Sequence, residues 1–501
     1  MATNSSASSG DLNPFIISLF LLLPILWIIL KQYNRNKSLP PGPKAWPIIG
    51  NLAQLGANLH RDLAQLAQVY GPVMSLRLGS QLLVVGSTPE AAVEILKTHD
   101  RLFSGRHVGH ISYAKSPHMN HVSLAWSSDC TQQWKLLRTL CRSEMFSWKM
   151  IENQSYLREK KLNELIEFLV SKEGEKIKIA QFVFASIFNF LGNILCSKDL
   201  VSFEEVEADS GLRRNMREIV ELYASPNISD FYPILSRLDL QGLKKKVDEC
   251  VKIVHGAWEG ILRDKRAKKA FRDSSNNNKD LMDVLLDNEF SDDQINYLFL
   301  ELFIAGSDTT SSTIEWAMTE LIKKPECMKT IRQELEREIS GNIIKESDLS
   351  RLSYLNACVK ETLRLHPPTP LLLPRRASEA CQIMNYTIPK GTQVVVNVWT
   401  IATNPNIWEE PLTFNPDRFL HTELDFIGND FELLPFGAGR RMCPGLNLGI
   451  RQVHFILASL IHHFEWSLPD NMLLHQLDMN EKFGVTVQKE QPLVIVMKQR
   501  K

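Results

Sequence analysis

The sequence lacks paired cysteines and an excess charge of either sign. Its eight cysteines are scattered without a Cys-x-x-Cys pair, which excludes the common zinc-site spacings and disfavours a disulfide scaffold. Lys plus Arg and Asp plus Glu both total 57, so the formal net charge is zero and nothing in the composition indicates a nucleic-acid partner. No internal repeat is visible, which excludes a solenoid. We therefore expect free thiols in a reducing compartment.

The sequence does contain enough apolar residues for a large folded enzyme. Its 501 residues are 44% hydrophobic and 23% charged, which are ordinary values for a globular protein. Local patterns predict an amphipathic helix at residues 60–71, a hairpin at 72–87 and strands within 381–398. Helical periodicity dominates from the hairpin to about residue 365. This predicts a mainly α fold with small β-sheets, of the α+β class, and not a doubly wound sheet.

One long run without charge lies near the N-terminus, at residues 12–30. Its nineteen residues would span roughly 28 Å as a helix, the thickness of a bilayer's hydrocarbon core. Basic residues follow it, so the positive-inside rule predicts a luminal start and a cytosolic remainder. A cleaved signal peptide is the alternative, but the basic leader and small-residue cleavage site that it needs are missing. The expected divisions are a luminal segment 1–11, a transmembrane anchor 12–30, a basic and proline-rich linker 31–47, and a catalytic domain 48–501.

The most informative stretch is PFGAGRRMCPG, at residues 435–445. Cys443 stands just before an expected helix, where unpaired backbone N–H groups and the helix dipole favour thiolate over thiol. The glycines permit tight turns and close approach to a flat, bulky group. A phosphate-binding loop would need Gly-Lys-Ser/Thr, and a dinucleotide loop would need glycine where Met442 stands. A buried structural cysteine remains the alternative; we expect a metal ligand, the thiolate that holds a heme iron.

A second candidate region lies on a long helix expected between Ser291 and Lys324. Ser291 and Gln294 form a capping-box pattern at its start, and Pro325 is the first residue that breaks it. Inside the helix, Gly306 next to several hydroxyl side chains predicts a local kink or widened turn.

Asp308 and Thr309 are the candidate catalytic residues on this helix. Cleavage of dioxygen requires delivered protons, which a carboxyl group and a neighbouring hydroxyl can relay. The alternative for Thr309 is a hydrogen bond to its own helix backbone.

Both regions resemble the cytochrome P450 family, of the plant microsomal type. The heme-binding signature of that family is matched at Phe436, Gly439, Arg441, Cys443 and Gly445, and its oxygen-activation motif at AGSDTT, residues 305–310. Segments such as VKETLRLHPPTPLLLPRRA and NYTIPKG resemble the alkaloid-pathway group that includes N-methylcoclaurine hydroxylase, corytuberine synthase, berbamunine synthase and littorine mutase. The resemblance covers essentially the whole chain.

The resemblance implies a cytochrome P450 monooxygenase with heme b and no tightly bound flavin. Electrons would come from NADPH through NADPH-cytochrome P450 reductase, and the substrate would be a small molecule. The protein would sit in the endoplasmic reticulum membrane as a single-pass protein with a cytosolic catalytic domain. The expected cofactor-binding residues are Trp134, Arg138, Arg375, Phe436, Arg441, Cys443 and Gly445.

A third motif is structural. Glu361 and Arg364 are three residues apart on one helix, so their side chains can pair. The resemblance implies that Arg418 completes this network, as a lock within the core and not as part of the catalytic machinery.

The expected substrate contacts are Glu301, Leu302, Ala305 and Leu371. If the substrate is an amine, Glu301 could be its counterion; the alternatives are pairing with a neighbouring arginine or exposure to solvent. We expect oxidation of a plant specialised metabolite, an alkaloid, by hydroxylation or an oxidative rearrangement such as that of littorine. Oxidative phenol coupling of a benzylisoquinoline alkaloid, an O2-independent isomerase on the same fold and a noncatalytic heme sensor remain alternatives.

Overall fold

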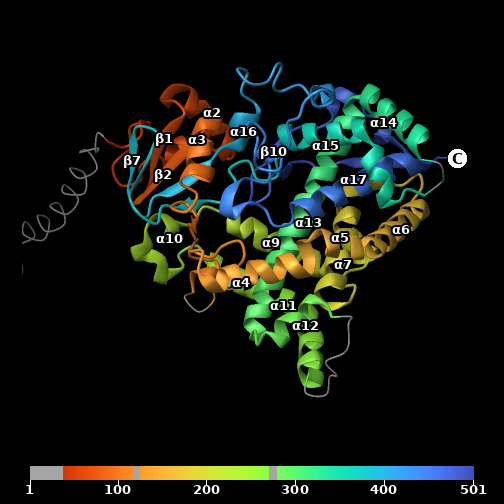
Figure 1. The fold of residues 1–501 in the computed structure, drawn as a ribbon, viewed down its shortest axis with the longest axis horizontal. Helices are drawn as coiled ribbons and strands as arrows, with labels where there is room; N and C mark the ends of the chain where they lie inside the picture. The colour runs from red at the N-terminus through yellow and green to blue at the C-terminus, as the bar shows by residue number, and fades with distance from the viewer. Residues whose placement is uncertain are drawn as a thin grey trace, which may run out of the picture.

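The computed structural model describes residues 38–116, 119, 123–269, 279–339, 341 and 343–500. The expected anchor at 12–30 and the luminal residues before it lie outside this range. Figure 1 shows two regions: the strands β1, β2 and β7 with α2 and α3 on one side, and a larger helical body crossed by α13. This agrees with the predicted α+β class.

Helices form most of the described structure. Their bounds are α2 (Leu59–Tyr70), α3 (Pro89–Val93), α4 (Gln132–Cys141), α5 (Trp148–Asn153), α6 (Ser155–Ser171), α7 (Ile179–Cys196), α8 (Phe203–Glu207), α9 (Gly211–Ala224), α10 (Ile228–Phe231), α11 (Leu243–Lys269), α12 (Leu281–Asp287), α13 (Asp292–Lys323), α14 (Pro325–Glu338), α15 (Ser353–Leu365), α16 (Val398–Ala402) and α17 (Leu446–His463). The predicted early helix is confirmed as α2.

The strands form small sheets. Their bounds are β1 (Val73–Leu78), β2 (Gln81–Gly86), β3 (Gly105–Arg106), β4 (Lys176–Lys178), β5 (Arg375–Arg376), β6 (Cys381–Ile383), β7 (Tyr386–Ile388), β8 (Gln393–Val396), β9 (Phe464–Ser467), β10 (Glu481–Lys482), β11 (Gln488–Lys489) and β12 (Val494–Gln499). The largest sheet has the order β1-β2-β8-β5-β3, with β2 and β8 parallel. The predicted hairpin is confirmed as β1–β2, and β6 to β8 confirm the strands expected within 381–398.

The long helix α13 begins and ends where the sequence predicts. The Ser291 hydroxyl accepts from the Gln294 N–H, and the Gln294 side chain accepts from the Ser291 N–H, which completes the capping box. A local kink or a widened turn was expected at Gly306; the widened turn is wrong, because α13 is α-helical throughout, and the kink stays a prediction. Gly306 serves close packing instead: a Cβ there would lie 2.8 Å from Cδ1 of Leu191 in α7.

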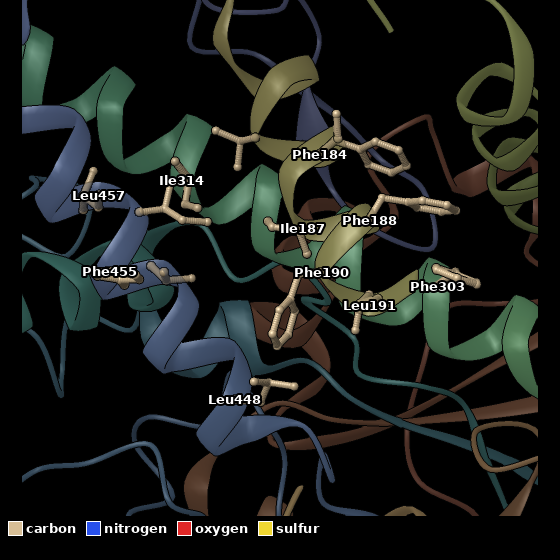
Figure 2. Packing of buried hydrophobic residues seen from close by; sticks show 14 of the residues in the cluster. Phe184, Ile187, Phe188, Phe190, Leu191, Phe303, Ile314, Leu448, Phe455 and Leu457 are labelled. Atoms are coloured by element: carbon tan, nitrogen blue, oxygen red, sulfur yellow. The ribbon is translucent and has the colours of Figure 1, made fainter. Parts of the chain in front are cut away.

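Helix α7 packs against α13 and carries much of the core. Figure 2 shows Phe190 of α7 directed toward Leu448 of α17, and the rings of Phe188 and Phe303 stack with their centroids 4.3 Å apart. Within the described residues, α7 is the one helix long and apolar enough to cross a bilayer, but 89% of it is buried inside the protein. It is therefore a core helix, and removing one of its large side chains would cost roughly 3–5 kcal/mol.

Candidate functional site

A cavity of about 300 Å³ is lined by α13 on one side and by the loop preceding α17 on another. The residues predicted from the sequence that line it are Arg138, Glu301, Leu302, Ala305, Thr309, Arg375, Phe436, Arg441, Cys443 and Gly445. Most of its lining is apolar, so charged groups within it stand out. Trp134, Asp308 and Leu371 do not line the cavity.

The Cys443 side chain lies at the cavity, three residues before the start of α17. The Cys443 N–H donates to the Phe436 carbonyl (3.0 Å), which closes the loop around the thiol. Burial raises the pKa of this thiol, while the Gly445 N–H and the charge of Arg138 act in the opposite direction. The N–H group at the helix start therefore favours thiolate, as expected, but burial of the thiol outweighs it. A coordinated cation would supply the missing stabilisation, because metal binding deprotonates a thiol.

Two glycines give the cysteine loop its shape. Gly437 and Gly439 have φ of 67° and 70°, the left-handed region that glycine adopts without strain. A Cβ on Gly439 would lie 2.1 Å from the Leu96 carbonyl oxygen, so no larger residue fits there. Gly445 is different: a Cβ there would meet Phe146 at 3.7 Å and the Cys443 sulfur at 4.0 Å, which are ordinary contacts.

Four buried or half-buried arginines converge on the cavity. Arg138 donates to the Met442 carbonyl (2.7 Å), and Arg441 donates to the carbonyls of Ser104 and Ser127. Arg375 is 3% exposed, and burial followed by the charge of Arg441 lowers its pKa to about 10.

The fourth arginine, Arg106, was missed by the sequence reasoning. It donates to the carbonyls of Ala125 (3.0 Å) and Leu373 (2.8 Å), and burial together with Arg375 and Arg441 lowers its pKa well below the ordinary value. Its pairing with Arg375 across β3 and β5 brings it to the cavity. Only the sheet register shows this, because no local pattern around residue 106 does.

The partners of these four guanidinium groups indicate whether the site fits a heme. Within the part of the chain that the structure describes, their protein partners are backbone carbonyls, and none of the four forms an ion pair with a carboxylate. Buried cations that repel one another call for anionic partners. The two propionates of heme b are such anions, and Cys443 lines the same cavity. The residues present therefore fit the group.

Trp134 contributes to the arginine cluster from behind. Its indole N–H donates to the Leu124 carbonyl (3.1 Å), and the guanidinium groups of Arg441 and Arg138 lie 4.4 and 5.4 Å from its ring centroid. It supports the arginines through cation–π contact. Trp134 was expected to bind the cofactor, but its side chain does not line the cavity.

The two candidate catalytic residues occupy different faces of α13. The Thr309 hydroxyl lines the cavity and donates to the Ala305 carbonyl (2.7 Å), the alternative that its helical position allowed. Asp308 is buried away from the cavity. Burial raises the pKa of Asp308 to about 6, and the charges of Arg213 and Arg217 oppose this shift.

Glu301 is buried and lines the cavity. It accepts hydrogen bonds from the Ser123 hydroxyl and from the N–H groups of Leu124 (2.8 Å) and Ala125 (3.3 Å). Burial raises its pKa, and these donors act in the opposite direction. Neither of the alternatives considered for Glu301, solvent exposure and an arginine partner, is found in the described structure. Among the described residues, the donors that hydrogen-bond to it are all neutral.

The structural lock lies behind the cysteine loop. Arg364 donates to both carboxylate oxygens of Glu361 (2.7 and 2.8 Å), and Arg418 donates to one of them (3.1 Å). Glu361 and Arg364 are 0% exposed. These hydrogen bonds hold the buried pair together. Removing one partner would leave an uncompensated buried charge at a cost of about 3–5 kcal/mol.

The expectation for Leu371 is wrong. Its side chain belongs to an apolar cluster beneath the sheet, with Leu63, Met74 and Val395. Its neighbours Leu372 and Leu373 line the cavity instead. Leu372 has a φ of 52°, so a left-handed turn follows Leu371 at the point where the cavity-lining leucines begin.

The fold and the cavity together define a class: an oxidoreductase whose heme is held by a cysteine thiolate beside a hydroxyl-bearing helix. The chain belongs to the cytochrome P450 family, whose model matches residues 40–496. Membership implies heme b, a small-molecule substrate and a reductase partner, and the protein is a monooxygenase of this family.

Three plant relatives illustrate the similarity. The chain is 49% identical to the probable (S)-N-methylcoclaurine 3'-hydroxylase isozyme 2 of Coptis japonica, covering 96% of this chain and 97% of the relative. It is 47% identical to corytuberine synthase of Coptis japonica, over 97% and 99% of the two chains. It is 38% identical to berbamunine synthase of Berberis stolonifera, over 97% and 98%.

Proposed function

We propose that this protein hydroxylates an amine-bearing plant alkaloid of the benzylisoquinoline type. NADPH-cytochrome P450 reductase supplies the electrons, and residues 12–30 anchor the enzyme in the endoplasmic reticulum membrane with its catalytic domain in the cytosol. The hydroxylase relative at 49% identity supports the substrate class, and the uncharged run of residues 12–30 supports the anchor.

The proposed mechanism assigns separate tasks to the residues around the cavity. Heme b, when bound through Cys443, supplies the reductive activation of dioxygen. Thr309 holds a proton on its hydroxyl at the cavity wall. Asp308, with a pKa of about 6, exchanges protons near neutral pH on the α9 side of the helix. The apolar lining excludes water from the reacting carbon.

The observation that supports an amine substrate best is the state of Glu301. The residue is 8% exposed and lines the cavity, and among the described residues its carboxylate has no cationic side chain within ion-pair distance. A buried anion without a counterion is costly, and a protonated amine nitrogen in the cavity would balance it. Glu301 would thereby hold the amine end of the substrate at the α13 wall of the cavity.

Replacing Glu301 tests this proposal. In Glu301→Gln, which keeps the size and one acceptor oxygen, the affinity for (S)-N-methylcoclaurine should fall about 10- to 100-fold, the loss expected for a desolvated charge pair. The measurement is the substrate-induced change in the heme absorption spectrum. The matched control is a neutral analogue acylated on nitrogen, whose affinity should change by less than about threefold. Equal losses for both ligands would contradict the counterion role.

Oxidative phenol coupling is the second candidate, because corytuberine synthase and berbamunine synthase are similar to this chain over almost its full length. The products differ in mass. Incubation of the reductase-reconstituted enzyme with benzylisoquinoline and tropane alkaloids should yield a product heavier by one oxygen atom; loss of two hydrogen atoms would support coupling instead.

A further inference from the structure

A cluster of charged side chains, buried except for Arg61, joins four parts of the fold, and none of its members lines the cavity. His366 follows the last residue of α15; its Nε2 lies 2.8 Å from Glu320 of α13, and its Nδ1 lies 3.5 Å from Glu481 of β10. The other oxygen of Glu481 accepts from His60 (3.1 Å) and Arg61 (2.8 Å), both in α2. The cluster therefore connects the sheet region to the helical body.

The geometry favours a charged His366. Carboxylates only accept hydrogen bonds, so an imidazole with a carboxylate at each nitrogen must donate from both, as the imidazolium does. Burial acts to lower the pKa of His366, but the hydrogen bonds to Glu320 and Glu481 outweigh it, and the net pKa is raised. The ring also stacks on Trp316, with centroids 4.0 Å apart, and the ammonium of Lys489 in β11 lies 4.6 Å from that indole ring.

The cluster stands where two cavity-lining segments begin. Pro368 and Thr369, just after His366, line the cavity, and so do Val485 and Thr486, just after Glu481. A backbone bond joins the segments, because the Val487 N–H donates to the Pro368 carbonyl (2.8 Å).

Helix α13 holds the same pair of segments from its own side. The Ser312 hydroxyl donates to the Val487 carbonyl (2.9 Å), one turn before the stacked Trp316. Three contacts thus set the relative position of the two segments. They are the ion pair between His366 and Glu481 and the two hydrogen bonds made by the backbone of Val487.

We propose that His366, held between Glu320 and Glu481, is a positioning residue that fixes the cavity wall formed by residues 368–369 and 485–486. It touches neither substrate nor cofactor and acts through the segments that it anchors. The inference rests on the proposed function only in taking this cavity as the place where substrate binds. It predicts that losing the His366 charge weakens large ligands and spares small ones.

Two azoles separate these effects without any assumption about the natural substrate. Imidazole binds iron but is too small to reach the wall, whereas clotrimazole carries the same ring on a bulky triaryl group that fills the cavity. In His366→Gln, whose side-chain amide can donate hydrogen bonds but carries no charge, clotrimazole binding should weaken about tenfold and imidazole binding by less than about twofold. Both affinities are measured from the shift of the heme absorption band.

His454→Gln is the matched control. His454 is also buried, in α17, and bonds to Asn356 (3.2 Å) and the Ile450 carbonyl (2.8 Å); among the described residues it has no carboxylate partner. The His454→Gln substitution should leave the ratio of the clotrimazole affinity to the imidazole affinity unchanged. Equal weakening of both azoles in His366→Gln, or no weakening of either, would overturn the proposal.

A pH titration of the unmodified enzyme gives a second test that needs no variant to fold. Because the pKa of His366 is raised, the imidazolium persists above about pH 6.5, the ordinary value, and is lost as the pH rises further. Clotrimazole affinity, expressed for the unprotonated azole, should fall over that rise while imidazole affinity stays constant. A constant ratio of affinities across the titration would contradict the role of the His366 charge.

Discussion

At the scale of single residues, Asp308 and Thr309 are neighbours in the chain that α13 turns toward different surroundings. Thr309 reaches the cavity, and Asp308 is buried where the charges of Arg213 and Arg217 act on it. Successive helical residues differ by about 100°, so one face cannot hold both side chains. The pair therefore spans the helix, and a proton passing between them crosses from the α9 side to the cavity side.

Replacing Thr309 by alanine should uncouple the enzyme. The variant loses the hydroxyl that holds a proton at the cavity wall, so NADPH consumption should continue while product formation falls about tenfold or more. The ratio of product formed to NADPH consumed measures this. Ser311→Ala is the control, because Ser311 is buried on the same helix, bonds to the Ser307 carbonyl (2.9 Å) and does not line the cavity. Tight coupling in Thr309→Ala would contradict the assigned role.

Individual residues were predictable where their chemistry is local. The role of Cys443 could be predicted from the glycines and arginines next to it in the chain, and the pairing of Glu361 with Arg364 from their spacing of one helical turn. Arg106 escaped prediction because its neighbour across β3 and β5, Arg375, is far away in the chain. Leu371 was assigned wrongly because the left-handed turn at Leu372 cannot be read from leucines alone.

At the scale of elements, the contact between α7 and α13 depends on Gly306. A Cβ at this position would press on Leu191, whereas a Cβ on Gly256 in α11 would have no atom within 4 Å. Alanine favours a helix interior over glycine by about 1 kcal/mol, so open space and close contact should give different outcomes.

The two glycines form a matched pair of substitutions. Gly256→Ala should stabilise the protein by about 0.4–1 kcal/mol, because it restricts the unfolded chain. Gly306→Ala should be less stable than Gly256→Ala by about 1–3 kcal/mol, the usual cost of overpacking. Denaturant unfolding of the heme-loaded enzyme gives both values. Equal stability of the two variants would show that Leu191 yields freely and that Gly306 is not needed for packing.

Element boundaries were predictable from local signals, and element shape was not. The capping box and Pro325 fixed both ends of α13 from residues next to one another. The widened turn expected at Gly306 was wrong because the purpose of that glycine depends on α7, a different element. Local sequence shows that a glycine is present but not what packs against it.

At the scale of the whole molecule, the cluster around His366 shows what a linear pattern cannot reveal. Its members come from α2, α13, the end of α15 and β10, and only the folded chain brings them together. The α+β class and the family were predictable because their motifs are short and ordered. The positions of the cavity walls were not, since they depend on contacts between distant segments.

The central claim for the whole molecule is that Cys443 holds a heme whose iron performs the oxidation. The most direct test is the absorption spectrum of the reduced, CO-bound enzyme, unmodified and with Cys443→His. The unmodified enzyme should give the red-shifted band of thiolate ligation, and Cys443→His should lose this band together with oxidation of the alkaloid substrate. A normal thiolate spectrum in Cys443→His would contradict the account.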